Sequence, residues 1–228
     1  MQIPTEAPVM ILSNAVLFPQ AMLPLYIFEP RYRRMLADSL DTHRMFCIAM
    51  QKPGRTRETP SPVAGIGLIR ASVNHDDGTS HLILQGIARV ELGPATRYKP
   101  YRVHKIRPVE AEASDESGIE PLMARVRELV MELLQRGAQF GFPVLQQFDT
   151  SKQKTDVESL ATSALESFLK LVRESDEPDQ LADLISAALL PSPILRQAIL
   201  EAMDLNERLT LLIQFLMDEL RRNSRKKS

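Results

Sequence analysis

Cysteine and glycine are scarce in this chain of 228 residues, and each shortage excludes a class of site. The single cysteine, Cys47, excludes an internal disulfide and any zinc site built from several cysteines. None of the nine glycines belongs to a G-x-x-x-x-G-K-[ST] loop, the element that holds nucleotide phosphates. No apolar run approaches membrane-spanning length and no signal-peptide pattern opens the chain, so we expect a cytoplasmic protein without a membrane partner.

The composition is that of an ordinary globular protein, with 44% hydrophobic and 25% charged residues. The net charge is only -1, but it is unevenly distributed. Residues 1–107 carry 14 Lys and Arg against 8 Asp and Glu, or +6, whereas residues 108–228 carry 14 against 21, or -7. The two halves therefore differ electrically, as two subdomains would.

The first half shows short apolar or alternating runs separated by turn residues, which predict strands. The predicted strands are Met10 to Leu12, Met22 to Ile27, Met45 to Met50, Gly65 to Val73, His81 to Leu92 and Tyr101 to Arg107. Asp76-Asp77-Gly78 predicts a hairpin turn, because glycine adopts positive φ without steric cost. Pro24 places the second strand at an edge, and Glu29-Pro30 predicts a helix start.

The second half predicts helices. An acidic, small-residue linker over 108–118 precedes an amphipathic helix around Leu122 to Leu134. Thr155 to Glu158 and Asp204 to Glu207 fit capping boxes that open two further helices. We therefore predict an α+β protein, with a small β-barrel-like subdomain over 1–107, the linker over 108–118 and a helical bundle over 119–228.

Three blocks of sequence resemble the N-terminal, substrate-binding domain of Lon proteases, especially its stand-alone form. The first runs from Leu17 to Arg33 and reads Leu-Phe-Pro, Leu-Pro-Leu, then Ile-Phe-Glu-Pro-Arg-Tyr-Arg; the others are 76–92 and 181–220. The resemblance implies a PUA-like barrel followed by helices, without the ATPase and peptidase of full-length Lon. It also implies a non-catalytic module whose partners are unfolded or tagged polypeptides and a separate ATP-dependent protease, and it leaves a homo-oligomer open.

The candidate binding residues are apolar. They alternate along the proline-interrupted segment or lie in a Phe-Gly-Phe-Pro stretch: Phe18, Pro19, Met22, Pro24, Tyr26, Phe28, Phe140 and Phe142. Because side chains of a strand point alternately to opposite faces, only one parity of the first segment can face the barrel interior. The other parity is either covered by the helical half or exposed as an apolar patch that binds a peptide.

Catalytic and metal-binding interpretations have weak support. Ser167 and Lys170 match S-x-x-K, but the companion motifs of penicillin-recognising enzymes are missing. Cys47 lies in an apolar strand after His43, where a core position explains it better than a nucleophile. His75 and His81 flank one turn without further ligands, so we assign no metal and no cofactor.

RNA binding through the positive barrel half is the alternative from another class. Its candidates are Arg31, Arg33, Arg34, Arg55, Arg57, Arg70, Arg97, Arg102, Lys105 and Arg107. They are scattered along the chain, there is no tryptophan, and no basic stripe is interleaved with stacking aromatics. Nucleic acid is therefore the less favoured partner.

Overall fold

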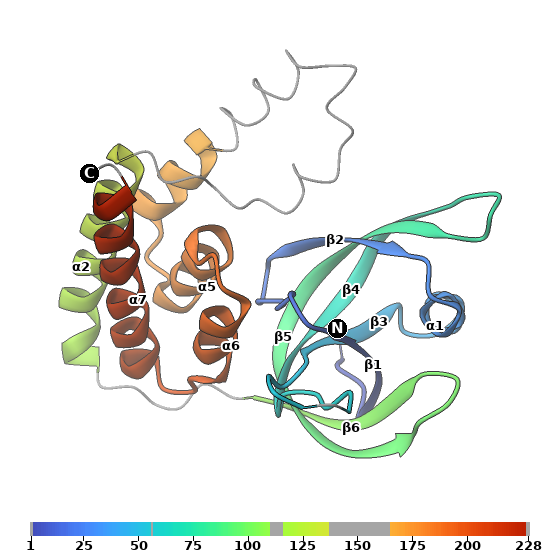
Figure 1. The fold of residues 1–228 in the computed structure, drawn as a ribbon. Helices are drawn as coiled ribbons and strands as arrows, with labels where there is room; N and C mark the ends of the chain where they lie inside the picture. The colour runs from blue at the N-terminus through green and yellow to red at the C-terminus, as the bar shows by residue number, and fades with distance from the viewer. Residues whose placement is uncertain (1, 56, 110–115, 137–164, 227–228) are drawn as a thin grey trace. The chain divides into compact units, whose positions relative to one another are not determined.

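The computed structural model describes residues 2–55, 57–109, 116–136 and 165–226, and these form an α+β protein, as predicted (Figure 1). The chain divides into two compact units. The first contains Met1–Glu110 together with Ser192–Glu201, and the second contains Ala111–Pro191 together with Ala202–Ser228. A short segment from within the range expected for the helical bundle thus groups with the barrel.

The first unit is built on one six-stranded sheet that closes on itself. Its strands are β1 (Glu6–Leu12), β2 (Met22–Ile27), β3 (Met45–Met50), β4 (Val63–Asn74), β5 (Ser80–Arg97) and β6 (Arg102–Pro108). They follow the order β2-β5-β4-β3-β1-β6, and an additional β5–β6 pairing closes the ring. The long β5 pairs with β2 along its first half and with β6 along its second half, so β2 stands at the end of the sheet.

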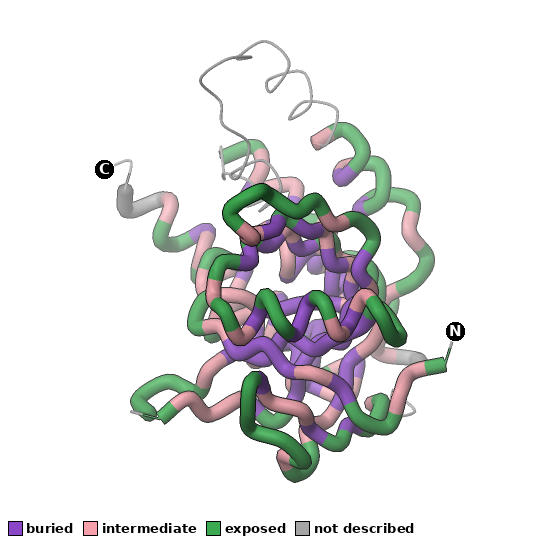
Figure 2. The backbone as a smooth tube through the Cα atoms, turned by 90° about the vertical axis from the view of Figure 1, so that its right-hand side faces the viewer, coloured by how far each residue is buried: buried purple, intermediate pink, exposed green. Residues whose placement is uncertain are grey.

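Two cores lie on opposite sides of β1 and β3. One takes residues from all five strands of the closed ring, and the other joins the opposite side chains of β1 and β3 to β2 and to helix α1 (Pro30–Leu40). Cys47 points into the first core and Phe46 and Ile48 into the second. This explains why the strand from Met45 to Met50 is apolar throughout, since a strand buried on both faces does not alternate. In Figure 2, α1 alternates between exposed and buried residues, the pattern expected of an amphipathic helix.

The segment before β2 is inserted into the second core. Leu17 and Phe18 both have 0% exposure. Their carbonyl groups approach Gly65 on β4 and Gly86 on β5 so closely that a Cβ built on either glycine would lie 1.9 Å from a carbonyl oxygen. Glycine is required at both sites because the backbone of residues 17–18 occupies the place of a side chain.

Helix α6 (Pro193–Glu201) is held against β4 and β5 of the first unit by buried polar contacts. The Gln197 side-chain amide donates to the Val63 carbonyl at 2.9 Å, and the Arg89 guanidinium donates to the Leu200 carbonyl at 3.3 Å. Each contact satisfies a polar group that burial would otherwise leave without water.

The second unit is helical. It contains α2 (Glu116–Gln135), a helix over 165–174, α5 (Pro178–Leu189) and α7 (Leu205–Lys226). α2 packs along α7, and the buried side of α7 carries Leu209, Leu212 and Leu216 at helical spacing, as the sequence predicts. Among the described residues, no helix combines the length and the apolar character that a bilayer span needs. The capping box predicted at Thr155 lies outside the described residues.

The predicted cap of the last helix is present. The Asp204 carboxylate accepts a hydrogen bond from the Glu207 backbone N–H at 2.8 Å. We expect Asp204→Ala to lower the free energy of unfolding by about 1 kcal/mol, because it leaves an N–H of the first turn without its partner. Urea unfolding followed by circular dichroism measures this loss. Asp204→Asn retains an acceptor and should lose much less, and equal losses for the two variants would contradict a role in capping.

Candidate functional site

The candidate site is the outward side of β2. Along the strand, Leu23, Leu25 and Ile27 are buried in the second core, each with at most 9% exposure. The alternate residues point outward: Met22 and Tyr26 are each 45% exposed, and Phe28, just beyond the strand, is 59% exposed. One face of β2 therefore lies in the core, and the other is apolar and accessible, as the alternation of side chains along a strand requires.

The two neighbouring strands extend this surface. Strand register places two rows of residues across β2, β5 and β4: Tyr26, His81 and Val73, and then Pro24, Ile83 and Ala71. Val73 is 60% exposed and Ile83 is half-buried. These six residues together with Met22 and Phe28 are called the β2 face below. It is a contiguous, largely apolar surface on three adjacent strands, with the polar His81 in one row, rather than a set of isolated exposed side chains.

Ring contacts order the side chains at one end of the β2 face. The Tyr26 and Phe28 rings stack with their centroids 5.8 Å apart, and Tyr26 lies 4.8 Å from the His81 ring. His81 in turn meets His75 edge-on at 4.9 Å. These offset arrangements are the ones that aromatic rings prefer, and they hold flat apolar surfaces in place before a ligand arrives.

The backbone edge of β2 is interrupted. Gly86 N–H donates to the Ala21 carbonyl at 2.9 Å, and the antiparallel ladder alternates from there, so the amide nitrogens of Met22, Pro24 and Tyr26 are directed away from β5. Proline has no N–H, and Pro24 therefore brings no donor to the middle of this edge. A strand added here would lose a central hydrogen bond, which favours binding through side chains over continuous strand addition.

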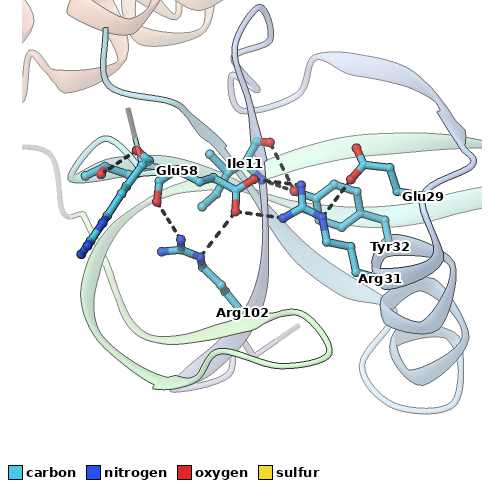
Figure 3. A network of polar contacts seen from close by, with 8 residues as sticks. Ile11, Glu29, Arg31, Tyr32, Glu58 and Arg102 are labelled. Carbon is cyan, nitrogen blue, oxygen red and sulfur yellow. Dashed lines mark hydrogen bonds and ion pairs between the residues drawn. The ribbon is translucent and has the colours of Figure 1, made fainter. Parts of the chain in front are cut away.

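Charged residues fix the junction between β2 and α1 (Figure 3). The Arg31 guanidinium donates two hydrogen bonds to the Glu58 carboxylate, at 2.8 and 2.9 Å, and a third to Glu29 at 2.8 Å. The bond to Glu58 raises the pKa of Arg31, so its charge persists. Arg102 donates to the Glu58 carbonyl at 2.7 Å. The network ties the loop around Glu58 to the residues that follow Phe28.

Tyr32 closes the same junction from inside. Its hydroxyl accepts a hydrogen bond from the Ile11 N–H at 3.1 Å and donates to the Ile11 carbonyl at 3.3 Å. The Glu-Pro-Arg-Tyr stretch that carried the resemblance is thus structural: Pro30 opens α1, and the other three residues lock the helix to β1 and to the loop around Glu58. This places Phe28 at a rigid end of the β2 face.

The predicted site residues do not all reach the surface. Met22, Pro24, Tyr26 and Phe28 lie together on the β2 face, and Pro19 is half-buried in the turn before it. Phe18 is completely buried and offers no surface to a ligand. Phe140 and Phe142 lie outside the described residues.

The contributions of β4 and β5 were not among the predicted site residues. Ile83, Ala71 and Val73 belong to predicted strands, but sequence alone does not pair them with β2. The available signal was the alternation through Leu82 and Leu84, both buried, which leaves His81 and Ile83 on the opposite side.

The candidate nucleophiles are poorly placed for catalysis. Cys47 is fully buried, and burial raises the pKa of its thiol, which keeps it protonated and unreactive. His43 is exposed on the turn before that strand. Ser167 and Lys170 are exposed on the helix over 165–174, and Lys170 lies 4.0 Å from Glu174, one helical turn further on.

Several arginines proposed for RNA binding contact carboxylates of the same unit. Besides Arg31, Arg34 pairs with Asp38 at 2.9 Å and Arg107 with Glu91 at 2.5 Å. Phosphate contacts would have to compete with these pairs, which weakens the case for an RNA-binding surface.

A hollow of about 690 Å³, lined by both charged and apolar residues, opens near the C-terminal end of α1 and the β5–β6 hairpin. On its wall, the Tyr101 hydroxyl donates to Asp38 at 2.7 Å, which lowers the pKa of that carboxyl, and the Arg97 guanidinium lies 4.3 Å above the Tyr101 ring. Asp38 and Arg97 thus already contact Tyr101 on this wall. The β2 face is therefore the stronger candidate.

Comparisons with known proteins give one consistent result. The sequence profile described as the ATP-dependent protease La (LON) substrate-binding domain matches residues 6–218. The chain is 23% identical to a Lon protease from Desulfosudis oleivorans and 25% identical to one from Dictyoglomus thermophilum. Each alignment covers 96% of this chain but only 24% of the first relative and 25% of the second. The chain thus spans about a quarter of the length of these relatives.

Solved structures agree on the fold. The N-terminal domain of a Mycobacterium avium complex Lon protease superimposes with a TM-score of 0.68 at 21% identity, covering 93% of this chain and 98% of that one. A Lon N-terminal domain protein from Xanthomonas campestris gives a TM-score of 0.63 at 20% identity, covering 93% and 99%.

Proposed function

Because the chain belongs to the family of Lon substrate-binding domains, we propose that it is a non-catalytic module that binds unfolded or tagged polypeptides through the β2 face. The bound polypeptide passes to a separate ATP-dependent protease. The matched family is the substrate-binding part of Lon, which is distinct from its catalytic part, and this supports recognition in place of bond cleavage.

The observation that carries the proposal is the ordered apolar surface itself. Tyr26, Phe28 and Val73 are each at least 45% exposed, although they belong to or adjoin strands whose other side is buried. An unfolded chain differs from a folded one in offering apolar side chains to such a surface. Aromatic anchors on a rigid scaffold bind at low entropic cost, because few rotamers are lost.

Binding is expected to depend on the two stacked rings. The test measures the fluorescence anisotropy of a labelled, reduced and alkylated polypeptide that cannot fold. Relative to the original chain, a Tyr26→Ser/Phe28→Ser variant should raise Kd by about tenfold or more, which corresponds to about 1.4 kcal/mol of lost contact.

Tyr98→Ser is the matched control. Tyr98 is 66% exposed and follows the far end of β5, outside the β2 face, so its replacement should leave Kd unchanged. Equal Kd values for the original chain and the double variant would refute the assignment of the site. Raising the salt concentration should alter Kd little, whereas RNA binding that weakens steeply with salt and ignores the double variant would favour the alternative function.

A further inference from the structure

His75 and His81 lie on either side of the β4–β5 turn, and the fold brings their rings into direct contact. The Nε2 atom of His75 is 2.7 Å from Nδ1 of His81. Both side chains are exposed. From the sequence these residues only flank a turn, whereas in the structure two imidazole nitrogens lie within hydrogen-bond distance of each other.

The pair is held by its surroundings. The His75 N–H donates to the Thr79 carbonyl at 2.9 Å, and the Asp77 carboxylate accepts from the Thr79 N–H at 2.9 Å and hydroxyl at 2.7 Å. On the other side, the His81 ring packs on Tyr26. Two imidazole nitrogens whose positions are fixed before binding lose little conformational entropy when they bind the same ligand.

We infer that His75 and His81 form a bidentate site for a divalent transition metal of the Ni²⁺ or Cu²⁺ type. Metal–imidazole bonds are about 2.0–2.1 Å long, so two nitrogens in neighbouring positions at a right angle lie about 2.9 Å apart. The observed separation of 2.7 Å is close to this value, and both rings must also turn so that their lone pairs face the metal. A tetrahedral ion such as Zn²⁺ would need about 3.4 Å between the nitrogens, a larger movement.

Metal binding requires no net loss of protons from the two imidazole rings. In the hydrogen-bonded pair one ring nitrogen donates to the other, and a metal needs the lone pair of both. The donating ring passes to its other neutral tautomer, so that His75 carries its proton on Nδ1 and His81 on Nε2, and no proton is released. Among the described residues, no cluster of three or more His, Cys, Asp and Glu is arranged to hold a metal, so water completes the coordination.

The test is titration of the untagged chain with NiCl₂. Calorimetry measures the binding, and NMR spectra report the histidine ring signals. One equivalent of Ni²⁺ should bind and shift the ring signals of His75 and His81 together. His75→Gln and His81→Gln should each weaken binding by about tenfold or more, because the second donor acts at high effective concentration. His43→Gln removes an isolated, exposed histidine and should leave affinity unchanged.

Two outcomes would overturn the inference: no saturable Ni²⁺ binding at millimolar metal, or binding that both glutamine variants retain at full affinity. Circular dichroism of each variant distinguishes loss of the site from loss of folding. The metal titration requires no polypeptide ligand, so its result is independent of the proposed function.

Discussion

Gly86→Ala is expected to lower the free energy of unfolding by about 3 kcal/mol, the upper part of the range for overpacking a core. The added Cβ would lie 1.9 Å from the Phe18 carbonyl oxygen and 2.8 Å from its carbon. Because these are backbone atoms, rotation of a side chain cannot relieve the clash. The segment of residues 17–18 must move, and it is completely buried.

Movement of that segment also disrupts its attachment to β5. Gly86 accepts a hydrogen bond from the Gln20 N–H at 2.8 Å and donates one to the Ala21 carbonyl at 2.9 Å, immediately before β2 begins. Each bond contributes about 1 kcal/mol. Gly86→Ala should therefore displace the start of the β2 face and weaken polypeptide binding as well as stability.

Urea unfolding of Gly86→Ala beside Gly93→Ala tests the cause. Gly93 is on the same strand, but its added Cβ would come no closer than 3.3 Å to another atom, so the loss should stay below about 1 kcal/mol. Similar losses for both variants would mean that strand propensity matters and the close approach of Phe18 does not. Failure of Gly86→Ala to yield folded protein would agree with the expected direction.

Arg208→Met is expected to cost about 3–4 kcal/mol in the helical unit, since it leaves buried acceptors without a donor. The Arg208 side chain is only 3% exposed. Its guanidinium donates to the Ala202 carbonyl at 3.0 and 3.1 Å and to the Met203 carbonyl at 3.3 Å, and it also contacts Asp179 at the start of α5. One side chain thus joins α5, α7 and the chain segment before α7.

Thermal and urea unfolding measure this loss, with two comparison variants. Arg208→Lys keeps the charge but cannot reproduce the planar set of donors, so an intermediate loss of about 2 kcal/mol is expected. Arg221→Ala removes an arginine whose side chain is 68% exposed and pairs with Asp218, and it should change stability by less than about 0.5 kcal/mol. A loss for Arg208→Met no greater than that for Arg221→Ala would contradict the proposed role.

Local pattern was sufficient for much of the fold. The strands Met22–Ile27 and Met45–Met50 and the helix start at Pro30 have the predicted bounds, because alternation, apolar runs and proline act over a few residues. Strand β5 continues to Arg97, past the predicted end at Leu92, because its second half pairs with β6. That pairing joins β5 to the next strand across a short hairpin turn, and the apolar pattern of residues 93–97 does not itself indicate a strand.

The sequence by itself determined which residues of β2 share a face, since side chains alternate with a period of two. The sequence also determined that the backbone edge of β2 has no N–H donor at Pro24. Only the tertiary structure decided what covers each face. Leu17 and Phe18 are buried because Gly65 and Gly86, respectively, leave room for their backbone, and His75 contacts His81 because the β4–β5 hairpin brings them together. Periodicity specifies which residues share a face, but what packs on that face depends on which segments the fold brings together, and the local pattern does not encode that.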